Sequence, residues 1–368
     1  MTSKSSNIIH DCLDGLSHKW LHNNILYFVR HGSHAYGTNN ETSDEDFRGI
    51  FIPPKIYFHG FKNNLEHVVR TDPDCQIFHI HKFYDLAIKN NPNVLEILFV
   101  DPEDHILIHD LMLPILEHKD KLISKLARAS FLGYARQQAH RIKQHRKFLL
   151  NPPVALPDRK SLGLPDIPEI SKAQWEAVSS AIKAKLELWN PDFQPFSSIQ
   201  KIYLHNKLTD ILSEMEITSD SKWESAARSI GLSDNYIELL QKEKQYINKI
   251  EEYKAFMDWK KNRNPKRSEL EAKIFFDSKH GSHLYRLLCI GKEILQDHKL
   301  VVRRPDAPLL LEIKNGHWTY EKLIEETDRM EEEINIIYKN STLRDMPDET
   351  FFDELCSNTV ERSFVDMT

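Results

Sequence analysis

The chain has 368 residues, of which 40% are hydrophobic, and its formal net charge is −6. That length exceeds the usual size of one compact core, so two domains are expected, and the composition excludes a disordered chain. The negative net charge argues against a protein that coats nucleic acid without specificity, because such binding depends on neutralising phosphates.

Neither a targeting segment nor a disulfide framework is indicated. No segment approaches the roughly 18 apolar residues of a membrane span, and the first twenty residues lack the apolar core of a signal peptide. We therefore expect a cytoplasmic location and no membrane partner. The four cysteines are widely scattered, which predicts reduced thiols.

The first hundred residues follow a mixed α and β pattern. A β-rich run at 25–30 ends close to a glycine, and a second run at 47–53 is closed by proline. Residues 75–80 predict a third strand, and apolar residues at helical spacing predict a helix over 82–89. Periodicity alone cannot assign the apolar run 94–100 to a helix or a strand.

Long amphipathic patterns follow, and they predict helices. Ser268 with Glu271 three residues later forms a capping box, which predicts a helix that starts just after a basic run. Two irregular pieces interrupt this part: a proline-rich loop at 151–168, and residues 301–318, where a short strand or hairpin is expected. The predicted helices lie within 106–115, 121–150, 172–188, 198–212, 234–260 and 268–296.

The change of pattern near residues 101–109 sets the expected domain boundary. Residues 1–105 are expected to form a mixed sheet with helices. Residues 106–345 are expected to form a mainly helical domain that contains the irregular insert, and residues 346–368 a C-terminal tail. The predicted fold class is therefore α+β.

The stretch "GSHAYGTNNETSDEDFRGI" joins the first two predicted strands. Gly32 allows a backbone to approach a polyphosphate closely, and the Ser33 hydroxyl and amide can bind phosphate oxygens. Asp44 and Asp46 are two residues apart, so on a strand they project to the same face. Two converging carboxylates repel each other unless a cation lies between them, and such oxygen ligands suit Mg²⁺ that also binds phosphates.

A transfer reaction between two metal ions needs a third ligand. Asp74 is the best placed candidate, because it leads an apolar strand that can lie beside the strand of the acidic pair. Asp72 is close enough in sequence to be confused with it, and the choice between them stays open. An Asp-x-Asp pair alone is common, but its combination with the upstream strand, the Gly-Ser turn and the acidic-led strand predicts a catalytic site.

The stretch "GSHAYGTNNETSDEDFRGIF" resembles the Gly-Ser to Asp-x-Asp signature of the DNA polymerase β nucleotidyltransferase superfamily. Within it, several further segments are similar to the RNA-ligase-associated nucleotidyltransferases of bacteria and large phages. The resemblance runs from about residue 26 to residue 324. The segments are "HKFYDLAIKNNPNVLEILFV", "FLGYARQQAHRIK", "NRNPKRSELEAK", "DSKHGSHLYRLL" and "RRPDAPLLLEIKNGHWTY".

The resemblance implies a polymerase-β-like nucleotidyltransferase domain followed by a mainly helical domain, with the active site in the cleft between them. An acceptor hydroxyl would attack the α-phosphorus of a nucleoside triphosphate and release pyrophosphate, with two Mg²⁺ ions or with Mn²⁺. Gly32 and Ser33 would bind the triphosphate, and the metal ligands would be Asp44, Asp46 and Asp74. The family's association with RNA ligases implies an RNA end as acceptor and an RNA ligase as functional partner. A protein or small-molecule acceptor stays open, as does the nucleotide, with ATP as one candidate.

Four more cationic or histidine side chains are candidates for binding the nucleotide. Arg48 follows the acidic pair on the same alternating face, where it either neutralises phosphate or forms an ion pair with a carboxylate. Lys279, His283 and Arg286 lie at i, i+4 and i+7, one face of a helix, which suits a helix that faces the triphosphate.

The basic run "WKKNRNPKRS" is the candidate site for a polyanionic acceptor, through Lys260, Lys261 and Arg263. A solvated loop between helices is the alternative. Two alternatives to the transferase also stay open: a metal-dependent phosphohydrolase or nuclease, and a noncatalytic protein that binds nucleotide or RNA.

Overall fold

The computed structural model describes residues 3–41, 43–60, 65–188, 199–201, 203–204, 207, 219–263 and 265–366. The chain divides into two compact units. The first unit consists of Met1–Ile142 together with Asp277–Thr368, and the second unit is Lys143–Phe276.

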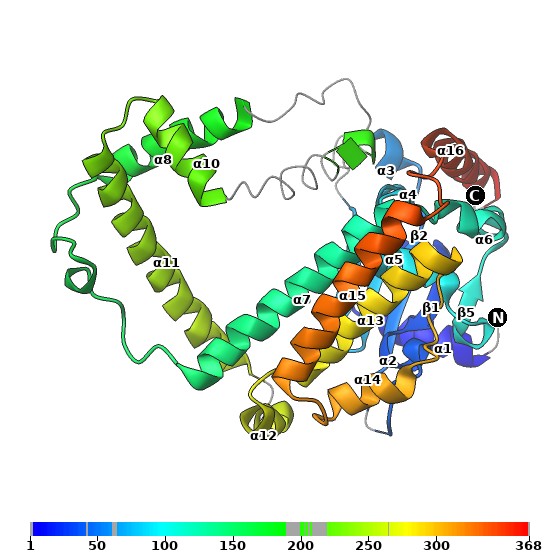
Figure 1. Cartoon of the computed structure of the whole chain (residues 1–368). Helices are drawn as coiled ribbons and strands as arrows, with labels where there is room; N and C mark the ends of the chain where they lie inside the picture. The colour runs from blue at the N-terminus through cyan, green and yellow to red at the C-terminus, as the bar shows by residue number, and fades with distance from the viewer. Residues whose placement is uncertain are drawn as a thin grey trace. The chain divides into compact units, whose positions relative to one another are not determined.

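A mixed five-stranded sheet organises the first unit (Figure 1). Its strands are β1 (Ile25–His31), β2 (Asp46–Phe51), β3 (His67–Thr71), β4 (Asp74–His79) and β5 (His105–Ile108). They lie in the order β3-β4-β2-β1-β5. The β2–β4 pair is parallel and the other three pairs are antiparallel. The predicted α+β fold is confirmed.

β1, β2 and β4 confirm the three strands predicted from the sequence, whereas β5 lies where a helix is predicted. A helix was expected over 106–115, but β5 pairs with β1 and only a short helix follows it. Ile106 and Leu107 pack against the core cluster of the sheet, so pairing and burial there favour the extended backbone over the helical spacing.

The sheet is covered on both faces. Phe28, Phe47 and Cys75 pack with the N-terminal helix, whereas Tyr27 points the other way and its hydroxyl donates to the Ile97 carbonyl at 3.1 Å.

The first unit contains both α-helices and short 3₁₀ helices, which are labelled η. They are α1 (Ser3–Leu13), η1 (Lys19–Asn23), α2 (Gly32–Tyr36), α3 (Ile56–His59), α4 (Ile80–Ile88), α5 (Pro92–Leu95), η2 (Glu96–Phe99), η3 (Pro102–Asp104), η4 (Asp110–Met112), α6 (Leu113–His118), η5 (Lys119–Leu122), the start of α7 (Leu126–Leu150), α13 (Ser278–Asp297), α14 (Ala307–Lys314), α15 (Tyr320–Asn340) and α16 (Glu349–Asp366).

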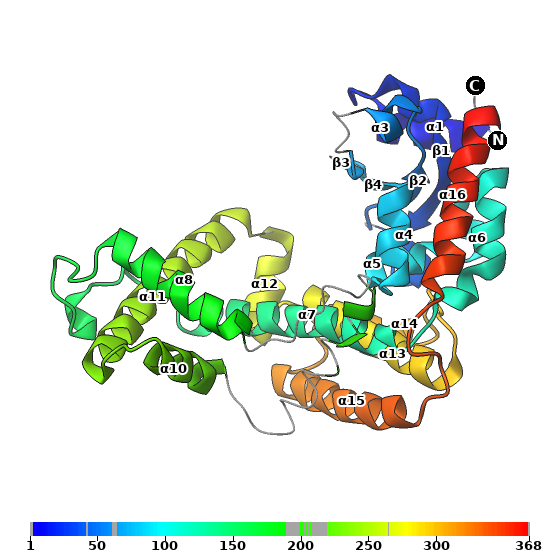
Figure 2. The same ribbon diagram turned by 90° about the horizontal axis from the view of Figure 1, so that it is seen from above.

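Helices far apart in the sequence complete the first unit. α13 packs against α14 and α15 (Figure 1), and α16 packs against α4 (Figure 2). The unit therefore includes the predicted C-terminal tail and the last part of the predicted helical domain, so the division differs from the predicted boundary near residue 105. The strand or hairpin expected in 301–318 is wrong: α14 forms there, with proline in its first turn, where a missing amide donor costs nothing.

The second unit is helical. It contains the end of α7, η6 (Lys160–Leu162), α8 (Lys172–Leu188), α10 (Ser219–Ser229), α11 (Asp234–Asn262) and α12 (Pro265–Ile274). An apolar cluster of Ile182, Ala226, Ala227 and Ile237 joins α8, α10 and α11. The proline-rich segment 151–168 is irregular apart from η6, as predicted. Most of the helix predicted over 198–212 lies outside the described residues.

The capping box at Ser268 is not formed. α12 starts at Pro265, and the Ser268 hydroxyl, already inside the helix, donates to the Pro265 carbonyl at 2.6 Å. The single helix predicted over 268–296 is also wrong, because Phe275 has a φ of +61° and breaks it, and α13 starts afresh with Asp277 as its N-cap. Among the described residues, no helix is both long and apolar enough to cross a membrane.

Candidate active site

The Gly-Ser turn lies where β1 passes into the five-residue helix α2. Gly32 has a φ of +62°, in the left-handed region that favours glycine. A Cβ atom built on Gly32 would lie 1.8 Å from Oδ2 of Asp46. The Asp46 carboxylate thus occupies the space that the absent side chain leaves, and any other residue at position 32 would displace it.

Asp46 and Asp74 are the first residues of two neighbouring parallel strands, β2 and β4, and are paired in register. Burial raises the pKa of Asp46, and so does the adjacent charge of Asp74, whereas Arg48 and Lys279 act in the opposite direction. The strand register therefore brings together two carboxylates that repel each other.

The other two acidic candidates lie outside the paired strands. Asp72 lies in the turn that precedes β4, so Asp74 is the residue that faces Asp46. β2 begins only at Asp46, so Asp44 lies before the strand and is exposed. Asp44 was expected on the same strand as Asp46, and this placement is wrong; whether the two carboxylates converge stays a prediction.

The paired carboxylates of Asp46 and Asp74 offer oxygen ligands for a divalent cation. In the part of the chain that the structure describes, no three His, Cys, Asp or Glu side chains are grouped as metal ligands. Mg²⁺ commonly binds one or two carboxylates and completes its coordination with water and substrate phosphates. Asp46 and Asp74 meet that requirement, and a cation would relieve the repulsion that raises the pKa of Asp46.

Two cations act on the carboxylate pair. Arg48 donates from Nη1 to Oδ1 of Asp74 at 3.1 Å and to the Phe47 carbonyl at 2.7 Å, so it forms the ion pair that was one of the two alternatives. Lys279, in the first turn of α13, is exposed, and its charge lowers the pKa of Asp46. Lys279 thus lies near the pair.

Arg286, predicted to bind the nucleotide, forms a buried ion pair within the protein. It is 5% exposed, donates from Nη1 to Oε1 of Glu96 at 2.8 Å, and stacks on the Tyr36 ring at 3.8 Å. The Tyr36 hydroxyl donates to the other oxygen of Glu96 at 2.8 Å. This buried ion pair joins α13 to α2 and to the start of η2, so the charge of Arg286 is already compensated by protein.

The sequence reasoning missed Glu96. A single acidic residue inside the apolar run 94–100 is a signal for a buried, paired carboxylate, because burying an unpaired charge is costly.

Three histidines of the first unit, on β1, α2 and α13, share one property. His31, His34 and His283 each have an Nε2 atom that is buried without a hydrogen-bond partner among the described residues. Burial first, and then Arg48 and Arg286, hold the pKa of His31 well below its usual range. Burial, and then Arg286, lower the pKa of His283 to about 3. The rings of His31 and His283 are therefore neutral at neutral pH.

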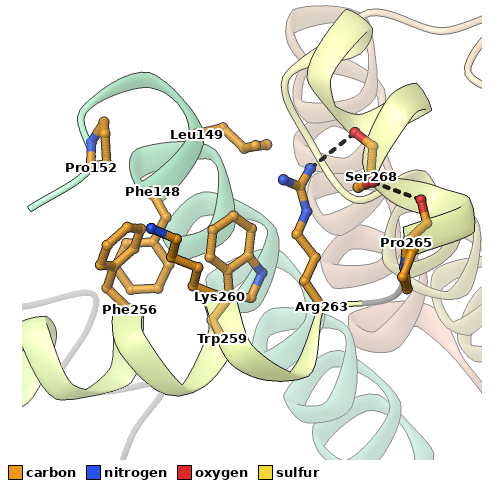
Figure 3. A pocket seen from close by; sticks show the side chains of 9 residues that line it. All are labelled: Phe148, Leu149, Pro152, Phe256, Trp259, Lys260, Arg263, Pro265 and Ser268. Carbon is orange, nitrogen blue, oxygen red and sulfur yellow. Dashed lines mark hydrogen bonds between the residues drawn. The ribbon is translucent and has the colours of Figure 1, made fainter.

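The basic run lies in the second unit, where α11 ends and α12 begins. Lys260 and Lys261 are exposed, whereas Arg263 donates to Oε2 of Glu271 at 2.9 Å and to the Ser268 carbonyl at 3.1 Å. Lys260 and Arg263 line a surface pocket of about 470 Å³ whose apolar part includes Trp259 (Figure 3). The predicted acceptor residues thus divide into two exposed lysines and one anchored arginine.

Comparison with known proteins gives one family and one relative. Residues 8–151, less than half of the chain, match the model of a family described as the RNA repair pathway DNA polymerase beta family. An uncharacterized 38.9 kDa protein from the nrdC–mobD intergenic region of Enterobacteria phage T4 is 29% identical over 120 residues, which cover 29% of this chain and 35% of the phage protein. The chain thus matches about a third of the length of that relative. No solved structure matches.

The matched segment contains the strands β1, β2 and β4, the Gly-Ser turn and both paired carboxylates, whereas α13 and the basic run lie beyond it. Over residues 8–151 this chain is therefore a match to the RNA repair pathway DNA polymerase beta family, and the resemblance to the DNA polymerase β superfamily read from its sequence is confirmed.

Proposed function

We propose that this protein is a nucleotidyltransferase that moves a nucleoside monophosphate from a nucleoside triphosphate to the hydroxyl of an RNA end. The observation that carries the proposal is the Asp46–Asp74 pair directly beside the turn at Gly32, on strands that match a polymerase-β-like family. The RNA acceptor follows from the description of that family, and an RNA ligase is the partner proposed to act on the same RNA.

Three groups of the protein would bind the triphosphate. The backbone at Gly32 and the hydroxyl of Ser33 lie at the end of β1, next to the carboxylates, and can donate to phosphate oxygens. The exposed ammonium of Lys279, whose charge already acts on Asp46, would neutralise part of the phosphate charge.

Asp46 and Asp74 would hold Mg²⁺, with Asp44 as the further ligand proposed for a second ion. When bound, Mg²⁺ would activate the acceptor hydroxyl and stabilise the charge that develops on the transferred and leaving phosphates. Arg48 orients Asp74 through its 3.1 Å ion pair and so fixes one of the two carboxylates before the substrate arrives.

The buried wall behind these groups would keep the site in shape. Glu96, Arg286 and Tyr36 hold α13 against α2 without exposing charge. The neutral rings of His31 and His283 add polar nitrogen atoms without adding positive charge that would compete for the carboxylates.

A product assay tests the proposal. The full chain is incubated with Mg²⁺, each α-labelled triphosphate in turn, and RNA, DNA or protein acceptors. We expect label on RNA with stoichiometric pyrophosphate, and loss of both with Asp46→Asn at unchanged stability. Labelled monophosphate or cleaved RNA without pyrophosphate would identify a phosphohydrolase or nuclease instead. Triphosphate binding without any product would identify a noncatalytic protein.

A further inference from the structure

The pocket at the junction of α11 and α12 has a wall of aromatic rings. Phe148, Phe256 and Trp259 form a cluster with ring centroids 5.4 to 6.0 Å apart, in which Figure 3 shows Trp259 between the phenylalanines and Arg263. All three rings line the pocket; Phe148 and Phe256 are buried, whereas Trp259 is half-buried. A volume of about 470 Å³ lies within the range of about 300–1,000 Å³ that accommodates small organic ligands.

The charges around the pocket are positive. Among the described residues, no Asp or Glu lines it, whereas Lys260 and Arg263 do. The Arg263 guanidinium lies 4.9 Å from the centre of the Trp259 ring and is fixed there by Glu271. Within the described chain, Lys260 and its exposed neighbour Lys261 form no ion pair. Of these two uncompensated ammonium groups, that of Lys260 lines the pocket with the aromatic rings, and that of Lys261 follows it on α11.

This combination is specific in its chemistry. Single-stranded nucleic acid is bound by cations that follow its phosphates and by aromatic rings on which its bases stack. A small apolar ligand would not need the lysines, and a free phosphate would not need the rings. The fit is therefore to a ligand that alternates flat rings with negative charges.

We propose that this pocket binds an unpaired base of single-stranded RNA, with the base against Trp259 and the adjoining phosphates on Lys260 and Lys261. The proposal deepens the proposed function, on which it rests only for the identity of the RNA as acceptor. Arg263 is a positioning residue that fixes the Trp259 ring.

Fluorescence anisotropy of the full chain, without triphosphate or metal, tests this proposal. The probes are a labelled twelve-residue oligouridine and the same strand with abasic central positions, which keeps every phosphate. We expect the complete strand to bind about tenfold tighter or more. Trp259→Leu should lose this difference while it retains the affinity for the abasic strand, and Trp259→Phe should retain most of it.

Matched variants separate the contributions. Trp175→Leu, a half-buried tryptophan of α8 outside the pocket, should behave as wild type. Lys260→Gln should weaken both probes by the same factor. If Trp259→Leu unfolds the second unit, the proposal is tested by the affinities of the wild type and of Trp259→Phe for the complete and the abasic strand.

The contrary results are equally clear. Equal wild-type affinity for the complete and abasic strands, or full discrimination in Trp259→Leu, would overturn the proposal. Equal binding of oligothymidine would support the pocket for either sugar, whereas binding of oligothymidine alone would overturn the assignment to RNA. If the pocket proposal is overturned, undiminished transfer to a short acceptor by Trp259→Leu would show that the proposed reaction is nevertheless correct.

Discussion

Gly32 carries two constraints, a positive φ and the contact with Asp46. Alanine at this position incurs the cost of the left-handed backbone, about 1–2 kcal/mol of folding free energy, and its Cβ also collides with the carboxylate at 1.8 Å. Because a shift of about 1 Å in a catalytic group can cost about a hundredfold in rate, we expect Gly32→Ala to lower turnover about a hundredfold.

The matched control for Gly32→Ala is Gly163→Ala. Gly163 has a φ of +68°, and nothing lies within 4 Å of the point that a Cβ atom would occupy, so alanine there carries the backbone cost alone. Urea unfolding should show a loss of stability for both variants, at least as large for Gly32→Ala, and only Gly32→Ala should lose transfer. Equal turnover in both would contradict the contact with Asp46 as a functional constraint.

Arg286 and Glu96 form a pair whose main effect is on stability. Glu96→Gln preserves the shape of the side chain but leaves the buried guanidinium without a counter-charge, which costs about 3–5 kcal/mol in comparable cases. We expect urea unfolding to show a loss of that order. At the exposed Lys82–Glu66 pair, Glu66→Gln should cost less than about 1 kcal/mol. A loss as small for Glu96→Gln would mean that the pair is not isolated from water.

At the residue scale, the sequence was most informative where a backbone rule applied. The Gly-Ser turn and the acidic start of β4 could be predicted because a strand end and a glycine have local signatures. The environment of Arg286 could not be predicted, since helical spacing groups it with Lys279 but does not show that Glu96, far away in the sequence, lies opposite it.

Among the elements, α13 gives the first unit a pH-dependent stability. Its residue His283 has a pKa of about 3 in the folded protein, because of burial and of the cations Arg286, His280, Lys279 and Arg141. An unfolded histidine binds a proton below pH 6.5 and the folded one does not, so stability falls as the pH drops from 6.5 towards 3.

We therefore expect His283→Gln to reduce the loss of stability between pH 7 and pH 5 by about 2 kcal/mol. Urea unfolding at the two pH values measures this difference, which is independent of how much the substitution destabilises the protein at pH 7. The exposed His10 provides the control, and His10→Gln should leave the difference unchanged. An unchanged pH dependence in His283→Gln would show that the ring is protonated in the folded state.

Elements were predictable where local pattern and tertiary contact agree. β1, β2 and α4 combine strong periodicity with glycine or proline at their ends. β5 and the break between α12 and α13 were missed because strand pairing and a left-handed Phe275 decide them. Ser268 and Glu271 have the spacing of a capping box in the sequence, but the helix begins three residues earlier, at Pro265.

Across the whole molecule, charge is distributed unevenly between the two units. The second unit, Lys143–Phe276, contains 22 Lys and Arg against 19 Asp and Glu, whereas the rest of the chain contains 27 against 36. The net charge of −6 therefore conceals one basic unit, and the argument from total charge excludes only a protein that binds polyanions over its whole surface.

This distribution predicts a local and separable salt dependence. For single-stranded nucleic acid, each neutralised phosphate contributes about 0.7 to the slope of log affinity against log salt. Replacing both Lys260 and Lys261 with glutamine should reduce the slope for oligouridine by about 1.4 and leave triphosphate affinity unchanged. The double variant Lys160→Gln/Lys172→Gln removes the same charge from exposed positions outside the pocket and should keep the wild-type slope. If both double variants lower the slope equally, polynucleotide binding depends on the overall charge of the unit, and the basic run has no particular role in it.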